Sequence, residues 1–413
     1  MKTVCMIVQN HYDMDIRVRR KAEALVAAGY EVDVLALADA KAPKENYTLC
    51  GVNVFALSLG KKRGSLLRYA FEYLAFFFWA FWKLSCMMGK RRYAVVDVNT
   101  LPDFLIFAGA WAKLRGAKLL LDMHEITPEF YMSKYGKGRK SFSIRLQTFI
   151  EWISMKFADH VLTINEPITK LLEGRGLRAG KSTEIMNAVD DALFASATST
   201  NAPDIAGANA TFVMMYHGTL THIYGLDISI TAFAKVHQQM PGAEFWILGG
   251  GTEKKNLEAL AQKLGLDGKV KFIGNVLPQE VPQWLKRCDV GVLATRRDGF
   301  LEFSFSNKIS EYIIMGKGVV ASRLKAIRHY YSEEAFAFFE PHNVEELSKQ
   351  MVRMYGDAEL RARLVARAKL EYEPINWDVM KNRYLVLVAK LGGVNESERA
   401  AVAGASEGVL AER

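Results

Sequence analysis

Short apolar, β-branched runs alternate with stretches of helical periodicity along the first 190 residues. The predicted strands cover residues 3–8, 31–37, 94–98, 118–122 and 161–164, and the predicted helices include 16–28 and 104–114. Gly29 directly follows the first helix, as expected of a residue that ends a helix. This alternation predicts a parallel sheet covered by helices on both faces, a fold that binds ligands beyond the carboxyl ends of its strands.

A second set of the same kind begins after residue 210. Its strands are predicted at 211–216, 244–248, 270–273, 290–294 and 318–322, and its helices at 223–238, 254–264, 282–286, 308–315, 344–370 and 377–391. Between the two sets, residues 194–210 are small and polar, contain proline and lack periodicity, which is typical of a linker. A chain of 413 residues is also long enough for two cores. The sequence therefore predicts two α/β domains, residues 1–193 and 211–375, and a disordered tail at 392–413.

The most hydrophobic segment of the chain is residues 69–88, YAFEYLAFFFWAFWKLSCMM. Glu72 and Lys83 interrupt it, although a spanning helix needs about 20 predominantly apolar residues. Basic triplets at 61–63 and 90–92 flank it, and aromatic helices with basic flanks commonly lie in the headgroup region of a bilayer. We therefore expect a membrane-associating segment near 61–92, with an ordinary buried helix and a true span as the alternatives.

Charge is distributed unevenly along the chain. Residues 1–190 carry 28 Lys and Arg against 19 Asp and Glu, whereas the remainder is balanced. This asymmetry indicates an anionic partner, either a membrane surface or a lipid-linked diphosphate, with ordinary solvated surface as the alternative. Nucleic acid is not expected, because no recognition motif accompanies the basic residues.

The four cysteines lie far apart and the N-terminus lacks the pattern of a signal peptide. Both features favour a reducing compartment and a cytoplasmic protein. Together with the apolar segment and its basic flanks, they predict a protein that is peripheral on the inner face of the cell membrane. No sequence pattern indicates a metal site, since HExxH, CxxC and a suitably placed DxD are all missing.

The segment 298–322, DGFLEFSFSNKISEYIIMGKGVVAS, carries the strongest chemical signal. Lys308 and Glu311 share one face near the start of a predicted helix, whose N-terminus favours an anion. A phosphate can bind Lys308 and the backbone N–H groups around Ser306 and Asn307, and Glu311 can accept hydrogen bonds from two ribose hydroxyls. The alternative is a surface ion pair between Lys308 and Glu311.

This segment resembles the nucleotide-sugar signature of the family-four retaining glycosyltransferases. Other segments resemble the same family in order, namely 11–37, 99–130, 185–194, 216–236 and 247–276. The resemblance covers nearly all of residues 1–390. It implies an α/β fold with two Rossmann-like domains facing a cleft, the GT-B architecture, with the helix at 376–391 packing back towards the first domain.

The resemblance also implies a set of donor-binding residues. Glu311 would bind the donor ribose, and the residues around the phosphates and the base would be Gly218, Thr219, Gly249, Gly250, Asn275, Ser306, Asn307 and Lys308. Many relatives carry a second glutamate that contacts the transferred sugar eight residues before Glu311, where this chain has Phe303 beside Glu302. The resemblance therefore leaves open whether Glu302 or Phe303 contacts the transferred sugar.

His124 ends a predicted strand and is the candidate catalytic residue, because an imidazole there can bind the transferred sugar or assist proton movement. A core or capping histidine is the alternative. On the acceptor side, Glu125 and Glu129 are candidates, with ordinary surface carboxylates as the alternative. Asp15 and Arg17 are further candidates: Arg17 either meets an acceptor phosphate or pairs with Asp15.

These expectations describe a retaining, metal-independent hexosyltransferase that needs no cofactor. It would move a sugar from a UDP- or GDP-linked donor to a glycan or lipid-linked acceptor, in the synthesis of a bacterial-type surface polysaccharide or glycolipid. The alternatives are a nucleotide-sugar epimerase or a phosphorylase of the same fold, and a non-catalytic membrane-associated scaffold.

Overall fold

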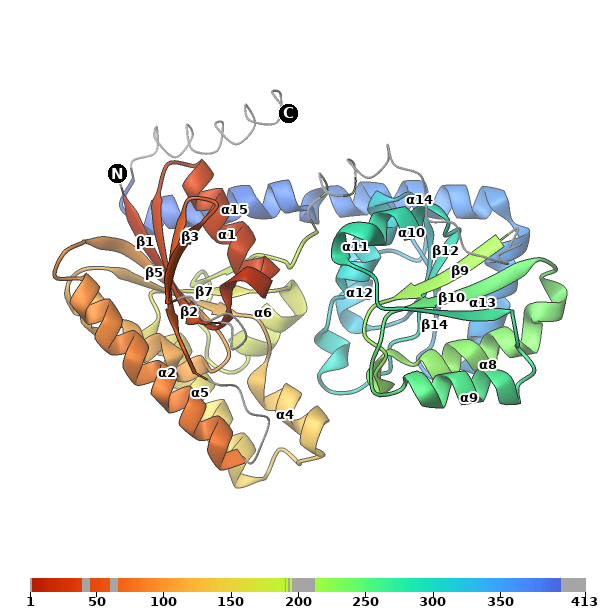
Figure 1. Cartoon of the computed structure of the whole chain (residues 1–413), viewed down its shortest axis with the longest axis horizontal. Coiled ribbons are helices and arrows are strands. Elements are labelled where there is room, and N and C mark those ends of the chain that lie inside the picture. The colour runs from red at the N-terminus through yellow and green to blue at the C-terminus, as the bar shows by residue number, and fades with distance from the viewer. Residues whose placement is uncertain are drawn as a thin grey trace. The chain divides into compact units, whose positions relative to one another are not determined.

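The computed structural model of the protein forms two compact units, Met1–Asn187 with Asp378–Arg413, and Ala188–Trp377 (Figure 1). The structure describes residues 2–38, 45–59, 66–189, 191, 194 and 212–394. The predicted linker after residue 194, the basic triplet at 61–63 and the tail after residue 394 lie outside these residues. Each unit is described by itself.

The first unit is built on an eight-stranded sheet with the order β3-β4-β2-β1-β5-β6-β7-β8. The strands are β1 Thr3–His11, β2 Glu31–Leu37, β3 Asn46–Leu49, β4 Val52–Leu57, β5 Tyr93–Asn99, β6 Lys118–Met123, β7 His160–Thr163 and β8 Ser182–Glu184. All neighbours pair in parallel except β3 and β4, which are antiparallel. The central strands are buried over nearly their whole length, as parallel strands covered on both faces must be.

Helices cover the two faces of this sheet. They are α1 Ile16–Ala27, α2 Leu66–Met87, α3 Ala110–Leu114, α4 Thr127–Tyr135, α5 Phe142–Phe157, α6 Glu166–Glu173 and α15 Trp377–Leu391. The helix predicted at 104–114 is instead a 3-10 stretch, η2 Asp103–Gly109, followed by α3. Helix α15 packs on this unit, where the Tyr384 hydroxyl donates to Asp97 at 2.7 Å and Lys2 Nζ donates to the Gly392 carbonyl at 2.9 Å.

The second unit has a six-stranded, parallel sheet with the order β11-β10-β9-β12-β13-β14. Its strands are β9 Phe212–His217, β10 Ala243–Leu248, β11 Val270–Gly274, β12 Val290–Leu293, β13 Gly318–Ser322 and β14 Ala337–Phe339. Its helices are α8 Leu226–Val236, α9 Lys254–Lys263, α10 Val281–Lys286, α11 Asn307–Ile314, α12 Lys325–Tyr330, α13 Val344–Gly356 and α14 Ala358–Tyr372. The prediction of a continuous helix at 344–370 is wrong. Asp357 adopts an extended conformation after Gly356 and caps α14 by accepting from Leu360 N at 2.7 Å.

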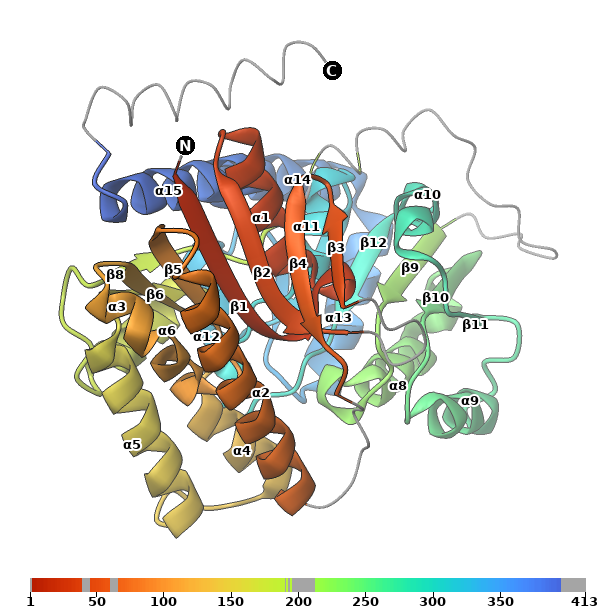
Figure 2. The same cartoon turned by 60° about the vertical axis from the view of Figure 1, so that its left-hand side comes forward.

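Helix α2 presents different faces to the domain and to solvent (Figure 2). Phe76, Ala80 and Leu84 are fully buried against the first unit, whereas Phe78 and Trp82 are 64% and 63% exposed. The alternative of an ordinary buried helix therefore holds for one face only. Across the described residues, no helix combines the length and the apolar character needed to cross a membrane.

Candidate functional site

The carboxyl ends of the strands in the second unit bring several loops together. Strands β9 and β12 are neighbours although they are far apart in the chain, so the connections from them leave in opposite directions. In open parallel sheets, ligands bind at such a point. The loops after β9, β10 and β11 carry Gly218, Gly249–Gly251 and Asn275, and the loop before α11 carries Ser306.

Three glycines allow these loops to approach closely. Gly218 and Gly249 have φ of +123° and +126°, a conformation that other residues rarely adopt. A Cβ atom at Gly249 would lie 1.9 Å from the Gly218 oxygen, and one at Gly250 would lie 2.7 Å from Asn275 Oδ1. A Cβ at Gly218 would lie 2.4 Å from Lys308 Cε. The structure thus brings Gly218, Gly249, Gly250, Asn275 and Lys308 together, as predicted.

The Lys308 side chain is held over the β9 loop by two tyrosines. Its Nζ lies 4.4 Å from the ring centroid of Tyr224 and 5.4 Å from that of Tyr216. Burial lowers the pKa of Lys308, and the nearby Glu311 carboxylate opposes this shift. No described residue forms an ion pair with Nζ, so Lys308 is a half-buried cation placed to receive an anion rather than the surface ion pair that was the alternative.

Glu311 is positioned by a residue that sequence reasoning missed. Glu311 Oε2 pairs with His217 Nε2, and His217 Nδ1 lies 3.0 Å from the Tyr312 hydroxyl. The Tyr312 hydroxyl donates to the Met215 carbonyl at 2.8 Å, so His217 links the Glu311 carboxylate to a tyrosine that the backbone holds in place. This arrangement fixes the carboxylate while leaving its other oxygen for a ligand. The available signal was the place of His217, directly before Gly218 in the loop.

The start of α11 offers further polar groups. Ser306 precedes the helix in an extended conformation and its side chain makes no capping hydrogen bond. Asn307 Oδ1 is buried and has no hydrogen-bond partner among the described residues. The first N–H groups of a helix lack partners within the helix and favour an anion. Ser306, Asn307 and Lys308 thus lie together at the start of α11, where an anion is favoured.

Three other predicted residues serve mainly within the domain. The Thr219 carbonyl accepts from the Tyr216 hydroxyl at 2.9 Å, which fixes the β9 loop. Glu302 pairs with Arg297 through one oxygen and accepts from Lys325 N at 2.8 Å through the other. Both Glu302 oxygens are thus engaged at the start of α12. Phe303 lies under Lys325, whose Nζ is 5.1 Å from the ring centroid.

In the first unit, His124 directly follows β6. Its Nε2 lies 3.2 Å from Asn99 Oδ1 and 3.3 Å from Asp122 Oδ2, and both of these atoms are acceptors. Burial lowers the pKa of His124, although Asp122 opposes this shift. The neutral ring therefore carries its proton on Nε2 and leaves the Nδ1 lone pair open, since no described residue bonds Nδ1.

A buried charge network holds this histidine. Lys21 Nζ pairs with Asp122 and donates to Asn99 at 2.8 Å and to Asp97 at 3.0 Å. Burial alone would raise the pKa of the Asp122 carboxyl, but Arg17 and Lys21 hold it well below its usual range. Asp122 is therefore a carboxylate that orients His124.

Arg17, Asp15 and Glu129 have partners within the first unit. Arg17 pairs with Asp122 at 2.6 Å rather than with Asp15, and contact with an acceptor phosphate stays a prediction. Asp15 instead caps α1 by accepting from Val18 N at 3.2 Å. Glu129 is fully buried and pairs with Arg175, so it is no surface carboxylate. Sequence reasoning missed the partners of Arg17 and Glu129 because they lie far away in the chain.

His124 opens into a cavity of about 600 Å³ that Asn10, Asp15 and Glu125 also line. Burial raises the pKa of Glu125, and Lys134 opposes this shift. Gln9, which sequence reasoning did not single out, lines the same cavity, and its Oε1 is buried with no partner among the described residues. The cavity thus offers a lone pair from His124 and free acceptors for a polar ligand. In the part of the chain that the structure describes, no group of three His, Cys, Asp or Glu is arranged to hold a metal ion.

Models of known protein families match residues in both units. Residues 14–188 match the glycosyl transferase 4-like domain, and residues 211–357 match the glycosyl transferases group 1. A lipopolysaccharide core biosynthesis glycosyltransferase of Rhizobium meliloti is 28% identical over 156 residues, which cover 38% of this chain and 43% of the relative. A phosphatidyl-myo-inositol mannosyltransferase of Mycolicibacterium smegmatis is 26% identical over 214 residues, which cover 51% of this chain and 53% of the relative. The match thus spans about half the length of each relative.

Solved structures share the fold across nearly the whole chain. A sucrose-phosphate synthase from Thermosynechococcus elongatus superposes with a TM-score of 0.73 at 18% identity, covering 95% of this chain and 100% of that one. HepE from Anabaena, solved in complex with UDP and glucose, superposes with a TM-score of 0.66 at 18% identity over the same shares. At these identities the likeness concerns the fold alone. Two family models that together span both units, and this fold, show that the chain belongs to the family-four type glycosyltransferases with the GT-B fold.

Proposed function

We propose that the protein is a retaining glycosyltransferase that takes a sugar from a UDP- or GDP-linked donor and transfers it to a glycan or lipid-linked acceptor. The observation that carries the proposal is the convergence of Lys308, Glu311 and the start of α11 on the Gly218 and Gly249 turns. A diphosphate needs positive charge and N–H donors, which Lys308 and α11 supply. A ribose needs an acceptor for its hydroxyls, which the open oxygen of Glu311 supplies.

The same residues support a reaction without a metal ion or cofactor. The leaving diphosphate gains negative charge as the sugar departs, and donors that are already in place stabilise such charge most effectively. Lys308 and the N-terminus of α11 are fixed donors of this kind. Retention of configuration is inferred from the family resemblance.

On the acceptor side, His124 is the proposed catalytic residue. Its neutral ring presents the Nδ1 lone pair towards the cavity, where it can accept a hydrogen bond from a sugar hydroxyl or assist its deprotonation. Asp122 and Asn99 fix the orientation of the ring. Glu125 lines the same cavity and supplies a second acceptor.

A membrane-bound acceptor suits the surface of the first unit. Phe71, Phe78 and Trp82 are all more than half exposed along α2, and aromatic side chains in such a row insert into the headgroup region of a bilayer. The excess of basic residues in the first 190 positions favours an anionic membrane. The relatives named for lipopolysaccharide core synthesis and for a phosphatidyl-myo-inositol acceptor agree with this proposal.

A transfer assay tests the proposal. The purified protein is incubated with labelled UDP- and GDP-linked sugars, with and without a bacterial lipid extract. We expect label from one donor to enter the lipid or glycan fraction, with retained anomeric configuration by NMR. Lys308→Ala should abolish transfer, whereas Lys263→Ala, on the exposed end of α9, should not. Interconversion of the donor sugar without an acceptor would indicate an epimerase instead, and no reaction with any donor would favour the scaffold.

A further inference from the structure

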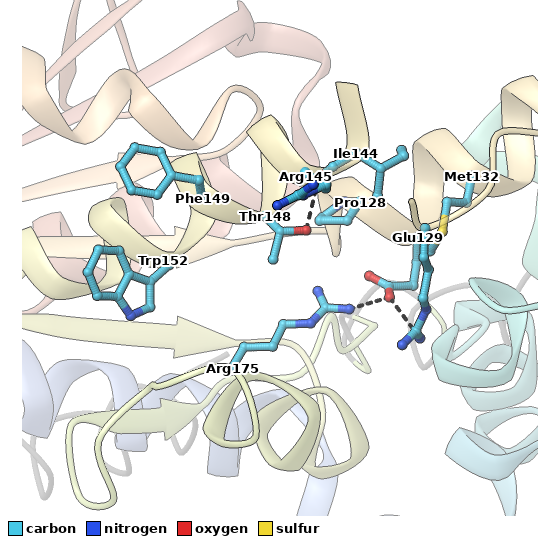
Figure 3. Close-up of a pocket in the computed structure, with 10 residues that line it drawn as sticks. Pro128, Glu129, Met132, Ile144, Arg145, Thr148, Phe149, Trp152 and Arg175 are labelled. Atoms are coloured by element: carbon cyan, nitrogen blue, oxygen red, sulfur yellow. Dashed lines mark hydrogen bonds and ion pairs between the residues drawn. The ribbon is translucent and has the colours of Figure 1, made fainter. Parts of the chain in front are cut away.

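A second cavity lies between α4 and α5 in the first unit (Figure 3). It has a volume of about 640 Å³ and shares no lining residue with the cavity at His124. This volume is within the usual range for small-molecule sites. Neither the donor residues nor the catalytic histidine accounts for it.

The walls of this cavity, which we call the α4–α5 pocket, are largely apolar. They are formed by Pro128, Met132, Ile144, Phe149 and Trp152. Phe149 is 55% exposed and continues a row of exposed apolar residues along α5, Phe142 and Leu146, at the spacing of one helix face. The pocket therefore opens onto an apolar surface strip. Contiguous exposed apolar surface of this kind marks an interaction site.

Arginines surround this apolar interior. Arg139, Arg145 and Arg175 line the pocket, and Glu129 is the single carboxylate among its lining residues. Arg175 is engaged with Glu129 and, at 3.1 Å, with Glu151. Arg145 is exposed and pairs with no described residue, and Arg139 is largely exposed at 3.6 Å from Glu129. The outer two arginines thus leave positive charge beside the opening, where an anionic group is favoured.

The Glu129 side chain indicates independently that the α4–α5 pocket binds a ligand. Its side chain is fully buried, and its Oε2 has no hydrogen-bond partner among the described residues. The carboxylate points into the space between α4 and Arg175 (Figure 3). A buried acceptor without a donor costs free energy, and a hydroxyl of a bound ligand would satisfy it.

We propose that the α4–α5 pocket binds an anionic lipid, with one aliphatic chain against Ile144, Phe149 and Trp152 and the anionic head at Arg145 and Arg139. An aliphatic chain alone would not contact the arginines, and an anion alone would not contact the apolar walls. The row of exposed apolar side chains on α5 gives the chain a dry path to the opening. The proposal goes beyond sugar transfer and does not depend on it.

Calorimetric titration with soluble probes below their micelle concentrations tests this site. Dodecyl phosphate carries both a chain and an anion, dodecyl maltoside only a chain, and inorganic phosphate only an anion. We expect dodecyl phosphate to bind at least 10-fold more tightly than either. Arg145→Gln should remove most of this preference over dodecyl maltoside. No nucleotide sugar is present, so the result is independent of the transferase proposal.

Two pocket variants and a matched control locate the bound chain. Thr148→Trp fills the pocket from α5, and Phe149→Ser removes part of its wall at an exposed position where the fold tolerates the change. Leu114→Trp adds the same bulk at the end of α3, at a residue that is 79% exposed and does not line the pocket. Each variant is checked by circular dichroism before titration. We expect at least 10-fold weaker binding of dodecyl phosphate to folded Thr148→Trp and to Phe149→Ser, and unchanged binding to Leu114→Trp.

Three outcomes would overturn the proposal. Equal binding to the wild type and both pocket variants would place the chain elsewhere on the protein. Equal binding of inorganic phosphate and dodecyl phosphate would reduce the site to an anion site. Equal binding of dodecyl maltoside and dodecyl phosphate would remove the role of the arginines.

Discussion

Gly249 lies where the loops after β9 and β10 touch, and its backbone conformation and the nearby Gly218 oxygen both exclude a side chain. Gly249→Ala should therefore force the two loops apart. We expect a loss of roughly 1–3 kcal/mol in the free energy of unfolding and loss of nucleotide binding. Chemical denaturation and nucleotide titration measure the two effects.

Gly265→Ala is the matched control for this change. Gly265 also has a positive φ, +68°, but a Cβ atom there would meet nothing within 4 Å. We expect it to cost stability through backbone strain, about 1 kcal/mol, while nucleotide binding persists. Equal loss of binding in both variants would mean that the close approach at Gly249 has no special role.

His217 acts at the same scale through its pairing with Glu311. His217→Phe removes the group that fixes the carboxylate, so we expect donor affinity to fall about 10-fold, or about 1.4 kcal/mol. The test is the dissociation constant of the preferred nucleotide sugar. His237→Phe, at the end of α8, is the control, because His237 bonds only the local Ala234 carbonyl. Unchanged affinity in His217→Phe would show that Glu311 needs no positioning partner.

At the scale of elements, sequence patterns predicted the buried strands and some helices well. The predicted ranges for β2, β13 and α15 coincide with the observed ones. The strand β13 is a short apolar run that begins at Gly318, and β2 is apolar after Glu31 except for Asp33; burial on both faces selects such runs. Other elements depend on information outside a local pattern. The break at Asp357 depends on one capping hydrogen bond, and the short antiparallel strand β3 depends on its pairing with β4.

Some residues of the candidate site could also be predicted from local sequence patterns, and others could not. Local sequence patterns indicate glycine turns and the start of a helix. They were therefore sufficient to propose Gly218, Gly249, Lys308 and Glu311. The pairing of Arg17 with Asp122 joins residues 105 positions apart, and no periodicity reports such a contact. The α4–α5 pocket depends in the same way on Arg175 reaching Glu129 from a distant segment.

The exposed aromatic face of helix α2 predicts that this helix binds membranes. Replacing Phe78 and Trp82 together with Ser removes exposed apolar area, so we expect several-fold weaker binding to vesicles that contain phosphatidylglycerol. The melting temperature should hardly change, because these side chains are exposed. Vesicle flotation measures the binding. Leu277→Ser, at a position in the second unit that is 56% exposed, is the control, and equal binding by all three proteins would contradict a membrane role for α2.

At the scale of the molecule, helix α15 packs back on the first unit. The Tyr384 hydroxyl of α15 donates to the buried Asp97, which shares Lys21 with Asp122. Tyr384→Phe should therefore cost about 1–3 kcal/mol of stability, because it removes a buried donor to a charged group. Tyr355→Phe removes an exposed hydrogen bond to the Pro241 carbonyl and should cost much less. Equal effects in thermal unfolding would contradict a structural role for α15 in the network.

The proposed function needs a donor site in the second unit and an acceptor cavity beside His124 in the first. The proposed donor site is the more specific of the two, since it combines the charge, the hydrogen-bond acceptor and the loops that a nucleotide sugar requires. Ligands that bind only the folded state raise the melting temperature by mass action. The site can therefore be tested without knowing the acceptor.

The most direct measurement is the melting temperature of the wild type, Glu311→Ala and Glu258→Ala with a panel of UDP- and GDP-linked sugars. Among the residues that the structure describes, Glu258 pairs with Lys254 alone, on the surface of α9, and it serves as the control. At a ligand concentration of about 100 times the dissociation constant, stabilisation of about 2.7 kcal/mol is expected. We expect one nucleotide sugar to stabilise the wild type and Glu258→Ala but not Glu311→Ala. Stabilisation of none of the three proteins, or of all three equally, would contradict the proposed donor site.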